Sequence, residues 1–282
     1  MGPRIPQGIA ADFRVLEAEH VTDTAIATVW RVTLADGSGA ALKLFHDSGL
    51  ANEGPGLDWL AARDGRGAVR LLRRAGRAVL MEWAPGPSLG DLSRTGQDMA
   101  ASRHLLDVAQ AVHAGSAGDL RGLPDLGDWF AALLKLAVAP DCPVSAAADL
   151  WRARDLARGL LASQRDVIAL HGDLHHDNVR HGPRGWLAFD AKGVRGERAY
   201  ELANAFRNPK GAERLQRDPA RIAACADLWS AGLGVARGRL LDWAAAKCAL
   251  SIVWRARGPV AADAEFDLLS LLLDVPRRGQ AA

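Results

Sequence analysis

One short segment constrains this chain more than any other feature. Residues 170–179 read LHGDLHHDNV, and residues 186–190 read WLAFD. The first segment follows a stretch of helical periodicity and is rich in groups that ionise or bind metals. The second is an apolar run that ends in an acid, as expected of a buried strand whose last residue reaches a site. Together they give the pattern His-x-Asp-x-x-x-x-Asn, followed by Asp at the end of the next strand.

This spacing is typical of sites that transfer a phosphoryl group. In such a site Asp173 accepts a hydrogen bond from the attacking hydroxyl and takes its proton, while Asn178 and Asp190 hold Mg²⁺. Magnesium prefers hard oxygen ligands from a few side chains together with the substrate's phosphates. We therefore predict Asp173 as the catalytic base and Asn178 and Asp190 as metal ligands.

The same loop leaves an alternative open. Its histidines, His171, His175 and His176, could with Asp173 form a zinc site of a metallohydrolase. A binuclear hydrolase would need further histidines at the ends of later strands, and only His181 follows. A polar turn without catalytic function is the third interpretation.

The order of expected elements predicts an α+β, bilobal fold. We expect a β-rich nucleotide-binding lobe over residues 1–84 and a mainly helical catalytic and substrate-binding lobe over 85–282. The Pro/Gly-rich stretch 84–90 separates them. Period-two patterns and turn residues predict strands near 25–34, 40–45, 68–73 and 77–83. Helices are predicted near 52–62, 98–114, 145–169, 219–236, 239–256 and 262–274.

The first lobe supplies the predicted nucleotide contacts. Lys43, the only lysine among the first 134 residues, follows Ala41 on a strand, as does the phosphate-binding lysine of kinases. Glu53, on the next helix, is the candidate partner of Lys43, with Asp58 as the alternative. Glu82 and Ala84, just before the Pro/Gly stretch, are predicted to offer backbone groups to adenine, since alternate residues of an extended segment face the same way.

Two expected features are missing. The stretch 21–28, VTDTAIAT, stands where a glycine-rich phosphate loop would be, and it has no glycine. Asp190 is followed by Ala-Lys-Gly. Lys192 could contact a phosphate or be a solvated side chain, and we favour the second interpretation.

Composition limits the remaining possibilities. The net charge of +2 is too small and dispersed to indicate nucleic-acid binding. The sequence contains no uninterrupted apolar run of about 18 residues, so we expect no membrane-spanning helix. The N-terminal residues do not have the pattern of a secretion signal. The three cysteines follow no metal or disulfide spacing. We expect a cytoplasmic protein that binds neither nucleic acid nor membrane; the oligomeric state is not predicted.

Beyond these patterns, the chain resembles the aminoglycoside phosphotransferases, in particular the streptomycin 6-kinase/hydroxyurea-resistance kinase branch. The resemblance covers about residues 20–275. Its motifs are DGRGAVRLL at 64–72, HGDLHHDN at 171–178, FDAKG at 189–193, YELAN at 200–204 and RNP at 207–209. It implies a protein-kinase-like fold and ATP- and Mg²⁺-dependent O-phosphorylation of a small molecule, with Asp173, Asn178, Asp190, Lys43 and Glu53 in the roles given above. It also implies that Glu201 supports the catalytic loop.

The resemblance makes a cationic, streptomycin-type aminoglycoside with a free hydroxyl the leading acceptor. Such an acceptor would need carboxylates near flat aromatic faces. Asp227 near Trp229, Asp242 beside Trp243, and Asp263 and Glu265 past Trp254 are candidates, but packing between helices explains each of these tryptophans better when it is taken singly. A kinase of another metabolite alcohol or sugar, and a catalytically silent kinase-like binding protein, stay open as alternatives.

Overall fold

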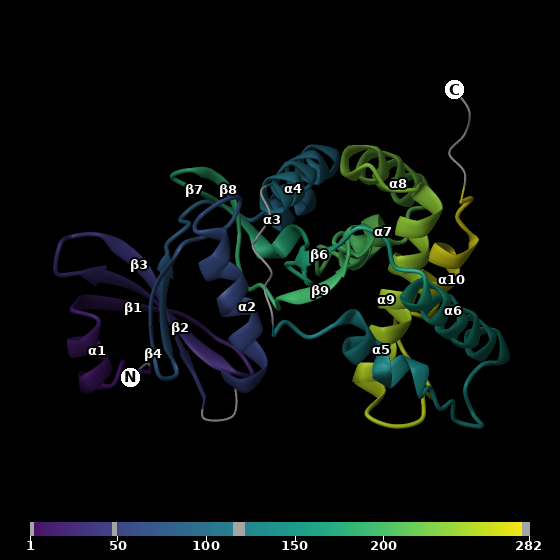
Figure 1. Cartoon of the computed structure of the whole chain (residues 1–282), viewed down its shortest axis with the longest axis horizontal. Helices are drawn as coiled ribbons and strands as arrows, with labels where there is room; N and C mark the ends of the chain where they lie inside the picture. Colours follow the sequence, from purple (N-terminus) through teal and green to yellow (C-terminus); the bar gives the residue numbers. More distant parts are fainter. Residues whose placement is uncertain (1–2, 47–49, 115–121, 278–282) are drawn as a thin grey trace.

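The computed structural model describes residues 3–46, 50–114 and 122–277. Figure 1 shows a sheet-containing part formed by the N-terminal residues beside a larger part built mainly of helices. The predicted α+β fold is therefore confirmed. Along the chain, β5 (Ala78–Glu82) is the last strand of the large sheet, and helix α3 (Leu89–Arg94) is the first element of the helical part. The lobe division that we propose at 84/85 lies in the connection between them.

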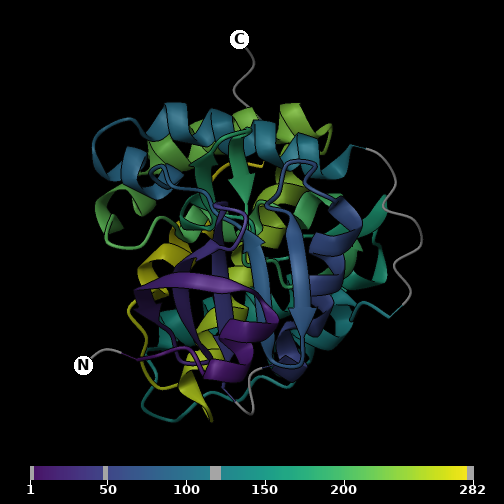
Figure 2. The ribbon, with the colours of Figure 1, turned by 90° about the vertical axis from the view of Figure 1, so that its left-hand side faces the viewer.

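The N-terminal lobe contains an antiparallel sheet with the strand order β1-β2-β3-β5-β4. Figure 2 views this lobe from the front, with helix α2 (Leu50–Arg63) beside the sheet. The other elements are α1 (Gln7–Asp12), β1 (Val15–Asp23), β2 (Ala27–Leu34), β3 (Gly39–Phe45) and β4 (Leu71–Ala75).

The two faces of β3 have different functions, as its alternation predicts. Leu42 and Leu44 pack with Trp30 and other apolar residues in the small core on one face. Ala41 and Lys43 point to the other face and line a cavity. Because side chains alternate along a strand, burying the leucines places Lys43 on the cavity side.

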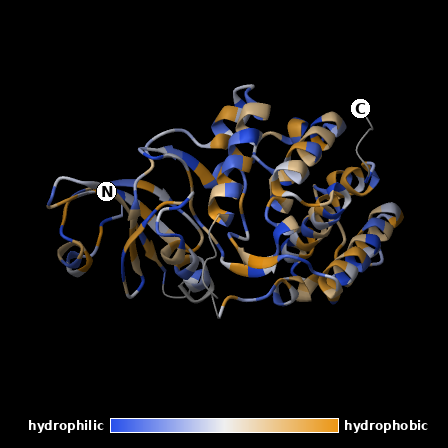
Figure 3. Cartoon of the chain, turned by 45° about the horizontal axis from the view of Figure 1, so that its top comes forward, coloured by the Kyte–Doolittle hydropathy of each residue, from blue (hydrophilic) through white to orange (hydrophobic). Residues whose placement is uncertain are grey.

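The C-terminal lobe packs amphipathic helices around one large core. Figure 3 shows apolar and polar positions side by side on these helices. The helices after α3 are α4 (Asp98–His113), α5 (Leu126–Leu134), α6 (Val144–Ala162), α7 (Glu213–Gln216), α8 (Pro219–Leu233), α9 (Arg237–Ala256) and α10 (Phe266–Asp274). Two short hairpin-like sheets pair β6 (Val167–Leu170) with β9 (Val194–Glu197), and β7 (Val179–Gly182) with β8 (Gly185–Ala188). Short 3-10 helices are η1 (His176–Asn178), η2 (Arg198–Tyr200) and η3 (Ala203–Arg207).

Several elements differ from the sequence prediction, which did not include helices α1, α3, α5 and α7 or strands β1, β6, β7 and β9. The helix expected over 145–169 ends at Ala162; Asp166 then adopts a positive φ of 47°, and β6 leads into the His171 loop. Strand β1 was not predicted, because its residues are mostly exposed and carry no apolar alternation. No helix in the described parts of the chain is long and apolar enough to cross a bilayer.

Candidate active site

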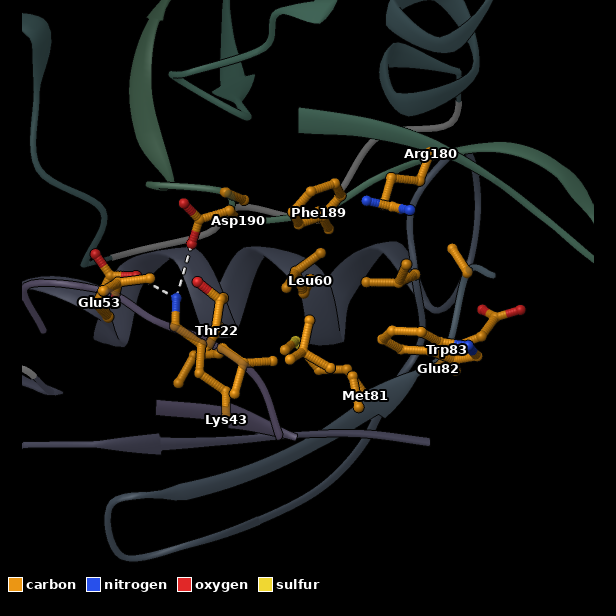
Figure 4. A pocket seen from close by; sticks show the side chains of 18 residues that line it. Thr22, Lys43, Glu53, Leu60, Met81, Glu82, Trp83, Arg180, Phe189 and Asp190 are labelled. Carbon is orange, nitrogen blue, oxygen red and sulfur yellow. Dashed lines mark hydrogen bonds and ion pairs between the residues drawn. The ribbon is translucent and has the colours of Figure 1, made fainter. Parts of the chain in front are cut away.

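A cavity of about 320 Å³ lies between the sheet and the segment that follows β8. Figure 4 shows Lys43 and Glu53 facing Asp190 across this cavity, with Met81, Glu82 and Trp83 toward its other end. The full lining comprises Val21, Thr22, Thr24, Val29, Ala41, Lys43, Glu53, Leu57, Leu60, Val69, Met81, Glu82, Trp83, Ala84, Arg180, Phe189, Asp190 and Ala191. The stretch 21–28 thus reaches the cavity through Val21 and two threonines, although it contains no glycine.

Four charged side chains meet at the end of this cavity. Lys43 Nζ lies 2.8 Å from Asp190 Oδ1 and 3.4 Å from Glu53 Oε2. Lys192 Nζ lies 2.9 Å from Glu53 Oε1 and 3.5 Å from Asp190 Oδ2. The predicted partner of Lys43 is therefore Glu53, while Asp58 pairs with Arg74. The interpretation of Lys192 as a solvated side chain was wrong: it bridges both acids.

The two lysines set the protonation of Asp190. Burial alone would raise its pKa, but Lys43 and Lys192 outweigh burial and lower the pKa to about 2. The acids in turn raise the pKa of Lys192 against the opposite effect of burial. Asp190 also holds a positive φ of 58°, a conformation that non-glycine residues adopt at a cost of order 1–3 kcal/mol. The carboxylate is thus held in place and ionised throughout the physiological range.

A close backbone approach fixes this cluster. A Cβ on Gly56, in α2, would lie 1.8 Å from the carbonyl oxygen of Ala191. A Cβ on Gly193, which has a φ of 64°, would lie 2.2 Å from the carbonyl oxygen of Pro55. Only glycine allows the helix carrying Glu53 to contact the Asp190 segment this closely.

Asp173 is held by two amides. Asn204 Nδ2 donates to Asp173 Oδ1 at 2.7 Å, and Asn178 Nδ2 donates to the backbone oxygen of Asp173 at 3.0 Å. Asn178 Nδ2 is also 3.5 Å from Asp173 Oδ2. Because Asn178 uses its amide nitrogen on Asp173, its Oδ1 is the atom left to bind a cation. Asn204 was quoted only as part of the YELAN motif, and sequence reasoning gave it no role in the site.

Glu201 supports the loop from below, as the resemblance implied. Its two carboxylate oxygens accept hydrogen bonds from the backbone N–H groups of His171 and Gly172, both at 3.1 Å. His113 Nε2 lies 2.8 Å away. Burial would raise the pKa of Glu201, but the hydrogen bond from His113 and the nearby charges lower it. A buried, ionised Glu201 therefore fixes the start of the catalytic loop.

The loop histidines serve the loop itself rather than a zinc ion. His171 Nδ1 accepts from the N–H of Asp173, and its Nε2 donates to the carbonyl oxygen of Phe189. Burial lowers its pKa, so the ring is neutral. His175 Nδ1 accepts from the N–H of Asp177. Among residues 3–46, 50–114 and 122–277, no group of three His, Cys, Asp or Glu is placed to hold a metal. The metallohydrolase alternative was wrong.

Glu82 and Ala84 line the far end of the cavity, next to Trp83 (Figure 4). The Glu82 N–H already donates to the Arg70 carbonyl oxygen at 2.9 Å, and its carboxylate pairs with Arg184. The backbone N–H of Glu82 is therefore already paired within the lobe.

A second cavity, of about 740 Å³, opens beside Asp173. Its lining includes Lys192, Lys247, Trp129 and Trp254, together with Glu53, Pro55, Gly122, Leu123 and Pro124. Glu53 belongs to both cavities, so the two meet at the charge cluster. Lys247 and Trp129 were not predicted; both lie in helices whose periodicity gives no sign of a site.

The four acids named as candidates for binding a cationic acceptor do not line this second cavity. Each is paired with arginine. Asp227 contacts Arg237, Asp242 contacts Arg277, Asp263 contacts Arg255, and Glu265 contacts Arg207 and Arg255. Their positions follow from helix packing and surface pairing.

Solved structures share the fold at low sequence identity. An aminoglycoside phosphotransferase APH(4)-Ia variant in ternary complex with AMP-PNP and hygromycin B has a TM-score of 0.64 at 15% identity, covering 95% of this chain and 97% of the other. Amicoumacin kinase in complex with AMP-PNP and Ca²⁺ has a TM-score of 0.61 at 14% identity, covering 95% and 92%. A choline/ethanolamine kinase family protein of Mesorhizobium loti has 0.63 at 16%, covering 92% and 89%. The protein-kinase-like fold is thereby confirmed.

Sequence relatives are more similar. Streptomycin 3''-kinase of Klebsiella pneumoniae is 40% identical over 210 residues, which are 73% of this chain and 76% of the relative. Hydroxyurea phosphotransferase of Kitasatospora aureofaciens is 32% identical over 249 residues, 81% of this chain and 65% of the relative. The family model described as aminoglycoside/hydroxyurea antibiotic resistance kinase matches residues 13–258. The chain belongs to this family of antibiotic-resistance phosphotransferases.

Proposed function

We propose that the protein transfers the γ-phosphoryl group of ATP to a hydroxyl of a small molecule, with Asp173 as the catalytic base. The observation that carries this proposal is the junction of the two cavities. The cavity with Lys43 and Asp190 has the volume and the apolar lining for part of a nucleotide, and the one beside Asp173 is open to an acceptor. Phosphoryl transfer needs mainly positioning and charge neutralisation, and the shared cluster supplies both.

The residues present fit a bound magnesium ion. Asp190 and the Asn178 side-chain oxygen are hard ligands on adjacent segments, since the Phe189 N–H donates to the Asn178 carbonyl at 3.0 Å. When bound, the metal neutralises charge on the transferred phosphoryl group. Lys43 and Lys192 now share two acids, and either can turn toward a phosphate oxygen. We propose that Lys43 binds the α- and β-phosphates and that Lys192, nearer the acceptor, faces the γ-phosphate.

In the transfer itself, the acceptor oxygen forms a bond to the γ-phosphorus and the bond to ADP breaks. The proton of the hydroxyl passes to Asp173 Oδ2, because Asn204 occupies Oδ1. Among acceptors, a streptomycin-type aminoglycoside is supported by the 40% identity to a streptomycin 3''-kinase. The sequence motifs resemble those of the 6-kinase branch, whereas the relative is a 3''-kinase, so we propose both hydroxyl positions of streptomycin for the test. A metabolite alcohol or sugar is the second candidate, because the acids expected to bind a cation lie outside the acceptor cavity.

The test uses purified protein, Mg-ATP and a panel of acceptors that includes streptomycin, with mass detection of the phosphorylated product. Asp173→Asn should lower kcat about 10³-fold with no loss of stability. Glu53→Gln should weaken Mg-ATP binding, whereas Asp58→Asn, its neighbour on α2, should not. Equal rates in wild type and Asp173→Asn would refute the assigned role of Asp173. Failure of the wild type to bind Mg-ATP would favour a catalytically silent protein.

A further inference from the structure

Lys247 is a buried cation that neither the fold nor the proposed transfer explains. It lies in the middle of α9, is 4% exposed, and lines the cavity beside Asp173. Its Nζ lies 4.6 Å from the ring centroid of Trp254. Within the described residues its ammonium has no ion pair and no hydrogen-bond acceptor. A buried ammonium without such partners is costly, and burial lowers the pKa of Lys247 to about 8.

The acids whose charges act on Lys247, Asp173 and Glu265, are already engaged. Asp173 accepts from Asn204, and Glu265 forms a two-pronged ion pair with Arg207. Glu53, which lines the same cavity, is shared by Lys43 and Lys192. Lys247 therefore lines the cavity without a hydrogen bond from its ammonium to any of these acids. A molecule bound in the cavity could supply the missing hydrogen-bond acceptor.

The aromatic lining narrows the kind of molecule. Trp129 and Trp254 meet edge to face, with ring centroids 6.2 Å apart. Trp254 is 44% exposed, so part of its indole surface is available at the cavity. Indole faces suit the C–H face of a saturated ring as well as a cation, but a cation on this wall would lie close to Lys247. Repulsion by the ammonium opposes a guanidinium or ammonium group there.

The charges lining the cavity select against an anion as well. Lys192 and Lys247 are balanced by Glu53 and Asp173, so the described lining carries no net charge. A carboxylate placed at Lys247 would also lie near Asp173, whose charge acts on Lys247. An uncharged ring rich in hydroxyls satisfies the ammonium donors without this repulsion.

We propose that Lys247, Trp254 and Trp129 form a subsite for an uncharged polyol ring, in which Lys247 donates hydrogen bonds to hydroxyl oxygens next to the reacting one. This inference rests on the proposed function in placing the acceptor beside Asp173, and it adds the chemical class of the group bound there. Any cationic substituents of the acceptor then point away from Lys247.

The test measures binding, so that it does not depend on turnover. Protein saturated with Mg-AMP-PNP is titrated calorimetrically with myo-inositol, with streptidine, which is a cyclitol bearing two guanidinium groups, and with glucuronate. Wild type should bind myo-inositol more tightly than the other two. Lys247→Met should weaken myo-inositol binding about 10- to 100-fold, the value of a hydrogen bond from a charged donor. Lys247→Arg should retain part of the affinity, and Lys135→Met, at an exposed lysine, should match the wild type.

Three results would overturn the subsite: no binding of myo-inositol by the wild type, unchanged affinity in Lys247→Met, or preference for streptidine or glucuronate over myo-inositol. If the wild type phosphorylates an acceptor and Lys247→Met binds that acceptor with unchanged affinity, the subsite is refuted and the proposed function is not. If the wild type phosphorylates no acceptor but binds myo-inositol, and Lys247→Met weakens that binding, the proposed function is refuted and the subsite is not.

Discussion

Replacing Lys247 by Met should make the protein more stable. Burial lowers the pKa of this lysine from 10.5 to about 8, despite the opposing charge of Asp173. At about 1.4 kcal/mol per pH unit, the folded state loses roughly 3 kcal/mol by holding the ammonium charged. Methionine keeps the apolar stem but loses the contact with Trp254, which is worth about 1 kcal/mol. The net gain is about 2 kcal/mol, a rise in Tm of roughly 4–8 °C.

The sign of the pH dependence gives this prediction its sharpest form. Between pH 8 and 10.5 the unfolded wild type keeps a proton that the folded wild type has lost, so wild-type stability rises with pH over this range. The advantage of Lys247→Met is therefore complete below pH 8 and disappears toward pH 10.5. The other charged or titratable groups acting on Lys247, which are Asp173, Arg207, Cys248 and Glu265, are present in both proteins.

The assay is urea unfolding of wild type and Lys247→Met at pH 7 and pH 10, with Lys135→Met as the control. The quantity to compare is the difference in unfolding free energy between variant and wild type at each pH, because other titrations cancel in it. A variant less stable than wild type at pH 7 would refute the reasoning. So would an advantage of the same size at pH 10.

Three further substitutions test the site. Gly56→Ala should lower kcat about 100-fold, because its Cβ would lie 1.8 Å from a carbonyl oxygen and displace the helix that carries Glu53. Gly54→Ala is the control: the space around Gly54 is open, so its kcat should stay near that of the wild type. Glu201→Gln should cost about 2 kcal/mol in urea unfolding and also lower kcat, since one loop N–H loses its acceptor; an unchanged kcat would contradict its supporting role. Lys192→Met should lower kcat about 10- to 100-fold with little change in the thermal shift caused by Mg-ATP; a loss of nucleotide binding instead would place Lys192 with Lys43.

The sequence was sufficient for the residues whose chemistry depends on local spacing. Asp173, Asn178 and Asp190 lie in two neighbouring segments, so the loop and the strand pairing after it bring them together. Lys43 and Glu53 could be paired because a strand followed directly by a helix leaves few other arrangements. Lys43 and Glu53 line one cavity with Asp190, and the chemical roles of all these residues remain predictions.

The missed contacts depend on segments that are distant in sequence. Lys192 looks solvated in a short Ala-Lys-Gly segment, and only the approach of α2 places Glu53 beside it. Lys247 lies within a long helix and is buried only because helices and loops pack around it. No periodicity identifies one buried lysine as facing a cavity. The arginines that pair with Asp227, Asp242, Asp263 and Glu265 are likewise brought there by helix packing, which sequence periodicity does not predict.

The residues that position Asp173 all belong to the helical lobe. A substitution among them should therefore lower kcat without weakening Mg-ATP binding. Glu265 holds Arg207, Arg207 Nη1 donates to Asn204 Oδ1 at 2.8 Å, and Asn204 donates to Asp173. Asp190 is held in part by Lys43 of the sheet, together with Lys192. Asn204→Ala should therefore lower kcat about tenfold by freeing the base, while Mg-ATP still binds as in wild type. In the Asp173→Asn background the same change should add little, because the two side chains act as a unit. Additive losses in the double variant would mean that Asn204 acts on the reaction by some route other than Asp173.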